Sequence, residues 1–121
     1  MEFIFILGRI LFGGFFVNSG INHFRNMKMM ASYSQMKGVP LPSVAVPFTG
    51  FLLFLGGLSV IFNYYIMYGS ILLIIFLVPT TFIMHNFWKV QDAQQKMGEQ
   101  INFMKNLALL GAALMFLKLF I

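Results

Sequence analysis

Long apolar runs separated by short polar segments dominate the pattern along the chain. The four runs are Phe3–Ile21, Val44–Phe62, Ile66–Met84 and Ile101–Ile121. Each is close in length to the roughly 20 residues that an α-helix needs to cross the hydrocarbon core of a membrane. Strand-like alternation is absent, and helices satisfy their own backbone hydrogen bonds in lipid. The pattern therefore predicts one all-α domain, residues 1–121, built as an integral membrane four-helix antiparallel bundle.

The connections between the runs differ in length and character. The connection over residues 63–65 is very short, so the second and third spans must be antiparallel neighbours. In the first connection, apolar residues recur at helical spacing and a glycine followed by prolines ends the pattern. This predicts a short amphipathic helix over Asn26–Lys37 in the membrane surface, with an ordered loop as the alternative. The third connection, Asn86–Gln100, is the most polar segment and is expected to be a loop.

Composition supports a membrane location and excludes several function classes. The chain is 60% hydrophobic and 9% charged, whereas soluble domains have about 25% charged residues. It contains no cysteine, which excludes disulfides, thiolate zinc sites, iron–sulfur clusters and dithiol redox chemistry. The net charge of +5 fits anionic lipid head groups better than nucleic acid, because no dense basic patch with interleaved aromatic residues is present.

The distribution of basic residues predicts the orientation. Six of the eight lie in or beside the first and third connections: Arg25, Lys28, Lys37, Lys89, Lys96 and Lys105. Only Arg9 and Lys118 lie toward the other side. By the positive-inside rule, the first and third connections are cytoplasmic and both termini lie outside. We expect a multi-pass protein of a bacterial or archaeal cytoplasmic membrane.

Polar side chains close the first span, end the third and open the fourth. In an antiparallel bundle these groups lie at the same, cytoplasmic end, which predicts a polar pocket between the helices. The candidates for ligand binding are Asn22, His23, His85, Trp88, Lys105 and Asn106. The alternative is purely structural, because interhelical hydrogen bonds of about 0.6 kcal/mol each often do no more than hold helices together.

Three other residues that interrupt the apolar runs are interpreted as structural. Arg9 is expected to snorkel toward the membrane surface or to pair with Glu2, one heptad away. The alternative for Arg9 is a buried functional cation. Asn18 shares a helix face with Asn22. Pro79 removes a backbone hydrogen bond and is expected to kink the third span.

The sequence offers few residues for haem binding, metal binding or catalysis. A haem held by His23 and His85 is conceivable, but both residues lie at span ends beside water, which argues against it. Two histidines and few carboxylates make a metal site less favoured still. No paired carboxylates lie within a span, and no Ser–His–Asp group can be placed in one pocket. We therefore expect no catalytic residues in this chain alone, no metal and no covalently bound cofactor.

Several segments resemble the DoxX family of small membrane proteins. They are Gly8-Arg9, Gly20–Phe24, Lys37–Pro42, Thr80–Trp88 and Phe103–Leu109. The resemblance implies a four-helix membrane subunit, in a family that includes the membrane partner of a thiosulfate–quinone oxidoreductase and members linked to oxidative-stress complexes. One departure is Leu53, which stands near the position where many relatives carry an acidic residue.

These observations lead to three hypotheses about function. The first is an accessory subunit of a quinone-linked membrane oxidoreductase, which binds a quinone-like or other small ligand at the cytoplasmic end. Its electrons would come from a partner, because the chain holds no redox centre of its own. The second is a structural or assembly subunit of a larger membrane complex, and the third is a small-solute transporter. The expected partner is another membrane or membrane-associated protein, with a homo-oligomer left open.

Overall fold

The computed structural model describes residues 2–121, which form helices and no strand. The helices are α1 (Glu2–Arg25), α2 (Met27–Met36), α3 (Pro42–Ile61), α4 (Ile66–Met84), the 3-10 turn η1 (Phe87–Lys89) and α5 (Ala93–Phe120). Helices α1, α3, α4 and α5 are long and apolar enough to cross a membrane. The predicted all-α membrane bundle is therefore confirmed, and α2 confirms the short helix between the first two spans.

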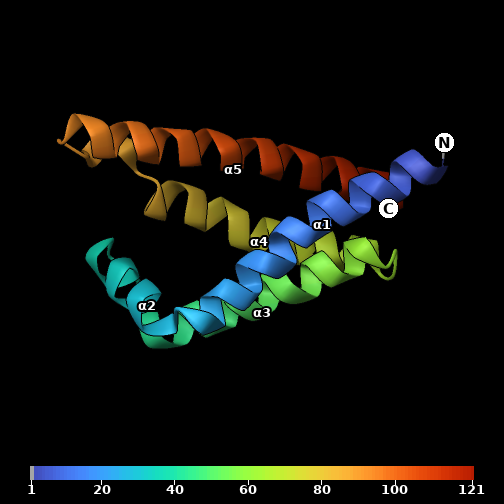
Figure 1. The fold of residues 1–121 in the computed structure, drawn as a ribbon, viewed down its shortest axis with the longest axis horizontal. Coiled ribbons are helices and arrows are strands. Elements are labelled where there is room, and N and C mark those ends of the chain that lie inside the picture. The colour runs from blue at the N-terminus through green and yellow to red at the C-terminus, as the bar shows by residue number, and fades with distance from the viewer. Residues whose placement is uncertain (1) are drawn as a thin grey trace.

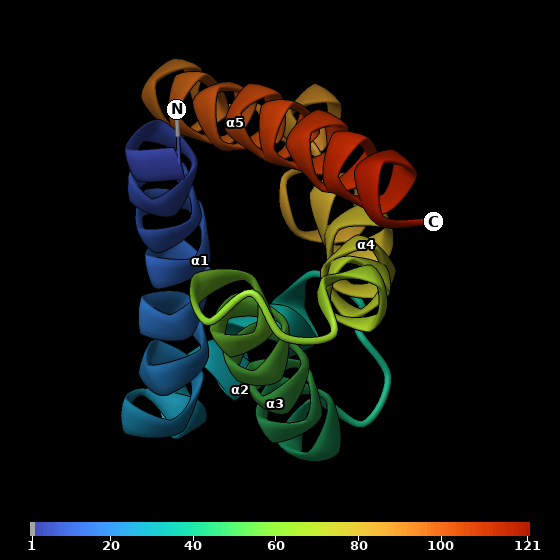
Figure 2. The same ribbon diagram turned by 90° about the vertical axis from the view of Figure 1, so that its right-hand side faces the viewer.

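The four long helices form a curved row. Helix α1 packs against α3, α3 against α4, and α4 against α5. Figure 2, a view down the long axis, shows α1 and α5 as the two outer helices of this row. Both chain termini lie at one end of the bundle with the α3–α4 turn, and α2 lies at the other (Figure 1). We call these the terminal end and the α2 end.

Glycines allow α1 and α3 to approach closely. A Cβ atom added at Gly13 would lie 2.6 Å from the carbonyl oxygen of Gly57, and one at Gly20 would lie 2.8 Å from that of Gly50. Small residues at such contacts let helix backbones pack against each other in a membrane. The core next to this contact is apolar and consists of Phe16, Leu53, Val60, Leu73, Leu77 and Ala113.

Helix α5 begins earlier than the sequence indicates. The polar segment Asn86–Gln100 was expected to be a loop, but its second half belongs to α5. The helix start is fixed by Asp92, whose carboxylate accepts a hydrogen bond from the backbone N–H of Gln95 at 2.9 Å. This is an N-cap, which satisfies one of the free N–H groups of a first helical turn. The loop prediction was wrong because the polar residues within 93–98 are exposed on the first turns of a helix that this cap begins.

Candidate functional site

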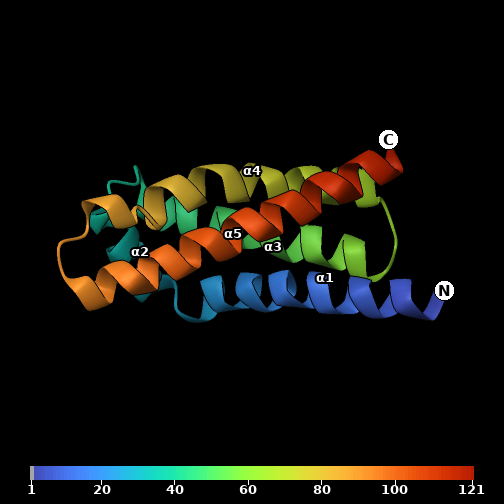
Figure 3. The same ribbon diagram turned by 90° about the horizontal axis from the view of Figure 1, so that it is seen from above.

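A cavity of about 350 Å³ lies inside the bundle at the α2 end. It is bordered by five of the six ligand-binding candidates: Asn22, His23, His85, Lys105 and Asn106. Figure 3 shows that α1 and α4 end at the end of the bundle where α5 begins. This antiparallel arrangement explains why residues from these three helices line one cavity. The sixth candidate, Trp88, does not line the cavity. Its ring packs edge-on against Phe87 and Phe103, with centroids 5.3 and 5.7 Å apart.

The cavity combines an apolar wall with polar groups. The wall contains the core residues Phe16, Leu53 and Leu77, together with Phe76. Besides the five candidates, the cavity is lined by five hydroxyl-bearing residues: Ser19, Tyr33, Ser34, Thr49 and Thr80. An apolar lining with a small number of converging polar groups is typical of sites that bind small molecules.

His23 offers a hydrogen-bond acceptor to the cavity. The residue is only 9% exposed, and its Nδ1 lies 2.8 Å from the carbonyl oxygen of Ser19. A carbonyl oxygen can only accept, so Nδ1 carries a proton and donates it to this bond. In the neutral ring, Nε2 then has a free lone pair. A hydroxyl or amide N–H of a bound molecule can donate to it.

Asn106 brings an amide without a protein partner to the same space. Its side chain is 5% exposed and lines the cavity. Over residues 2–121 this amide takes part in none of the side-chain hydrogen bonds. Its nitrogen and oxygen are not fully buried, so a molecule in the cavity can reach them. The amide is therefore available for a ligand that accepts or donates a hydrogen bond.

The charged centre of the α2 end is Glu99, a residue that the sequence analysis did not include among the candidates. Glu99 is 6% exposed. Its carboxylate lies 2.8 Å from Lys37 Nζ, accepts a hydrogen bond from the Tyr33 hydroxyl at 2.8 Å and lies 3.1 Å from His85 Nδ1. We call these four residues the Glu99 cluster. Lys37 Nζ also donates to the Asn86 side-chain oxygen at 2.8 Å.

The Glu99 cluster holds α2 beside the cavity. Helix α2 packs mainly on α3, whereas Glu99 and His85 belong to α5 and the end of α4. The bonds of Tyr33 and Lys37 therefore connect the α2 region to the opposite side of the cavity. Burial and the hydrogen bond to Glu99 raise the pKa of Tyr33 to about 12, so its hydroxyl stays protonated and continues to donate.

Comparison with known protein families agrees with this architecture. The family model for DoxX matches residues 4–86, which is more than half of the chain. The chain belongs to the DoxX family. No curated protein and no solved structure matches it. The DoxX match covers α1 to α4, whereas α5, which carries Glu99, Lys105 and Asn106, lies beyond the matched residues.

A helical signal in this DoxX chain could have identified Glu99. The buried residues of α5 are Glu99, Asn106 and Ala113, and each is seven positions from the next. Residues at this spacing lie on one face of a helix. Recognising Asp92 as the N-cap would have extended the helix over Glu99 and placed it on the same face as Asn106.

Arg9 does not act as the sequence analysis expected. It is 9% exposed, so it does not snorkel into water. Its Nη1 lies 3.4 Å from the carbonyl oxygen of Ile61, and its guanidinium lies 5.0 Å from the centroid of the Phe5 ring. Over residues 2–121 the only ion pairs are those of Glu99, so Arg9 does not pair with Glu2. Ile61 ends α3, and the free carbonyls of a helix C-terminus attract a cation.

The other two structural candidates lie outside the cavity. Asn18 is exposed on α1. Pro79 lies inside α4 and is exposed, and the helix continues past it to Met84. The kink expected at Pro79 stays a prediction.

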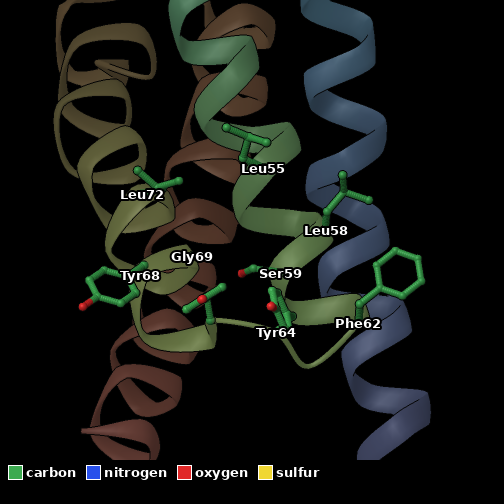
Figure 4. A pocket seen from close by; sticks show the side chains of 9 residues that line it. Leu55, Leu58, Ser59, Phe62, Tyr64, Tyr68, Gly69 and Leu72 are labelled. Atoms are coloured by element: carbon green, nitrogen blue, oxygen red, sulfur yellow. The ribbon is translucent and has the colours of Figure 1, made fainter.

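The terminal end of the DoxX protein has a hollow of a different kind. Figure 4 shows it between α3 and α4, with Leu55 and Phe62 on one side and Tyr68 and Leu72 on the other. Its volume is about 380 Å³, and no acidic or basic residue lines it. The Ser59 hydroxyl in this hollow already donates to the Gly56 carbonyl oxygen at 3.0 Å. The charged, imidazole and amide side chains that line a cavity are therefore at the α2 end.

Proposed function

We propose that this DoxX protein is a membrane accessory subunit of a redox system and that its cavity at the α2 end binds the head group of a quinone-like molecule. The observation that carries the proposal is a cavity with an apolar wall that is lined by Asn106, whose amide makes no side-chain hydrogen bond within residues 2–121. A flat ring with polar oxygens needs hydrogen-bond donors beside apolar surface, and this cavity offers both.

The cavity residues match the two forms of a quinone-like ring. The carbonyl oxygens of the oxidised form accept hydrogen bonds, and Lys105 and Asn106 are donors that line the cavity. The hydroxyl groups of the reduced form donate, and the free Nε2 of His23 accepts. The rings of Phe16 and Phe76 provide aromatic surface for the ring of the ligand.

The proposal assigns binding to this chain and electron transfer to a partner protein. Without cysteine, the chain cannot hold an iron–sulfur cluster or a redox-active dithiol. His85 lines the cavity while its Nδ1 faces the buried Glu99 carboxylate. A carboxylate in this position fixes the orientation of the His85 ring, so that Nδ1 bears the proton. Nε2 is then free to form a hydrogen bond with a ligand.

Asn106→Leu tests this function. We expect it to weaken the binding of a long-tailed benzoquinone about fivefold to tenfold, which is the effect of losing one hydrogen bond to a neutral group. The affinity is measured through quenching of the fluorescence of Trp88, the only tryptophan. The matched control is Asn102→Leu, because Asn102 lies on the same helix but does not line the cavity. Equal affinities of the two variants would contradict the proposal.

A structural or assembly role is the second candidate, and one observation favours it. On the outer helix α5, a Cβ atom added at Gly111 would have no neighbour within 4 Å, and Ala108 is exposed. Small residues on an open helix face let another membrane helix approach. This role predicts a stable complex with a second protein in mild detergent that Gly111→Phe disrupts. A protein that always purifies alone would exclude it.

A further inference from the structure

The two outer helices, α1 and α5, leave a seam along one side of the bundle. Helix α1 packs on α3 and α5 packs on α4, and α1 and α5 face each other across the side that remains (Figure 2). Their side chains meet at three places along the seam. Phe5 is 6.4 Å from Phe120 and Phe12 is 5.1 Å from Phe116 between ring centroids, and Lys105 Nζ lies 5.3 Å from the centroid of Phe15.

The cavity reaches the seam at the third of these contacts. Phe15 and Lys105 both line the cavity, and both are exposed, Phe15 by 39% of its surface. They belong to helices long and apolar enough to cross a membrane, and a route from the bilayer into the cavity requires that their exposed surface face the lipid. A molecule dissolved in the bilayer would then reach the cavity by displacing one cation–π contact, which is worth about 0.5–2 kcal/mol.

Lys105 makes this opening favour ligands with an oxygen-bearing head group. It is the one lysine or arginine that lines the cavity. Within residues 2–121, both ion pairs belong to Glu99 and neither includes Lys105. A lysine in a membrane-spanning helix needs a partner for its charge, and over residues 2–121 Lys105 has the cation–π contact with Phe15 but no ion pair. An oxygen-bearing head group at the cavity mouth would be such a partner, with the Asn106 amide beside it.

We propose that the ligand of this cavity is a tailed, membrane-dissolved amphiphile that enters through the seam between α1 and α5. Its oxygen-bearing head group contacts Lys105 and Asn106, and its apolar tail lies along the seam over Phe12 and Phe116. This inference rests on the proposed function, because it concerns the same cavity. It adds that the tail contributes to recognition and that the ligand arrives from the bilayer, not from water.

Closing the seam tests the proposed route. The chain contains no cysteine, so a pair of cysteines can be introduced and joined by a short bis-maleimide. The pair Phe12→Cys and Phe116→Cys joins α1 to α5 across the seam. The pair Phe24→Cys and Phe51→Cys is a matched control, because these two rings are also 5.1 Å apart but join α1 to α3.

The probes are a benzoquinone with a long alkyl tail and the same ring without a tail. We expect the Phe12–Phe116 cross-link to slow binding of the tailed probe about tenfold, equivalent to about 1.4 kcal/mol in barrier. Binding of the tailless probe should stay unchanged, and the control cross-link should affect neither probe. A tailed probe that binds at the same rate with the seam cross-linked would overturn the inference.

A second measurement tests the seam without any quinone. In a Trp88→Phe background, Phe16→Trp or Phe76→Trp places a fluorophore at a residue that lines the cavity, and Leu73→Trp places one in the core outside it. Lipids brominated on their acyl chains should quench the two cavity positions more than Leu73→Trp, and the Phe12–Phe116 cross-link should remove the difference. Equal quenching at all positions would refute the seam. If this quenching is seen and quinones do not bind, the proposed function fails while the bilayer route stands.

Discussion

The two ends of the bundle differ in the surroundings of their polar side chains. At the terminal end, the buried Arg9 lies next to the carbonyl oxygen that ends α3, and the nearby hollow has no charged lining. At the α2 end, the buried carboxylate of Glu99 has partners from two segments, the α2 region and the end of α4. Asn106, seven positions further along the same face of α5, makes no side-chain hydrogen bond in residues 2–121. Within residues 2–121, Arg9 Nε and the Ser70 hydroxyl at the terminal end are also buried without a partner, but neither residue lines the hollow there. At the α2 end, Lys105 and Asn106 border a cavity and are therefore within reach of a ligand. This difference is the reason for assigning function to the α2 end.

The largest expected effect of a single change is at the centre of the Glu99 cluster. Glu99→Gln leaves the Lys37 ammonium without its counter-ion, and breaking a buried pair on one side costs about 3–5 kcal/mol. We expect a loss of about 3 kcal/mol in the free energy of unfolding, at the low end because 12% of the Lys37 side chain stays exposed. The measurement is equilibrium unfolding in mixed micelles.

The matched control comes from the terminal end. Glu2 is exposed and forms no ion pair in residues 2–121, so Glu2→Gln should change stability by less than about 0.5 kcal/mol. Equal losses for the two variants would remove the contrast between the ends.

Helix packing between α1 and α3 is the second test. Gly13→Ala places a methyl group against the Gly57 carbonyl, and such overpacking costs about 1–3 kcal/mol. Gly14→Ala is the control, because no atom lies within 4 Å of the added Cβ. It should be neutral or stabilise the helix by up to about 1 kcal/mol. The shift in the thermal unfolding midpoint relative to the wild type should differ between the two variants in sign or clearly in size. Identical midpoints would argue against the close α1–α3 contact.

Replacing Tyr33 has the smallest expected effect on the free energy of unfolding, and this effect depends on pH. Tyr33→Phe removes the hydrogen bond to Glu99 and should cost about 1 kcal/mol. The folded pKa of about 12 lies above the ordinary value of 10, so the stabilisation is complete below pH 10 and disappears as the pH rises through 12. The difference in near-ultraviolet absorbance between the wild type and Tyr33→Phe should show one phenolate forming near pH 12. A wild-type titration complete by pH 11 would contradict this placement of Tyr33.

The sequence predicts the helices well because their signals are local. The number of spans, the short turn after α3 and the stop after α2 follow from apolar runs, glycine and proline, and all of them appear in the structure. The start of α5 does not, because it depends on the Asp92 cap. The grouping of Asn22, His23 and His85 follows from antiparallel topology alone, and the structure places them around one cavity.

The rest depends on contacts that connect distant segments. Glu99 looks like a loop residue until the Asp92 cap is recognised, and Lys37 is 62 positions away from it. Trp88 lies outside the cavity because two phenylalanines take its ring. Arg9 contacts a carbonyl 52 positions away. The contacts of Lys37 with Glu99, of Trp88 with Phe103 and of Arg9 with Ile61 join distant segments, so no local pattern reveals them.

Photolabelling most directly tests the central claim that the α2 end binds a quinone-like head group. A tailed quinone with a photoreactive ring is incorporated with the protein into lipid nanodiscs, and the labelled residues are located by mass spectrometry. We predict labels close to His85 and Asn106 that an excess of unlabelled tailed quinone removes. Labels spread evenly over lipid-facing phenylalanines, or confined to the hollow at the terminal end, would contradict the account.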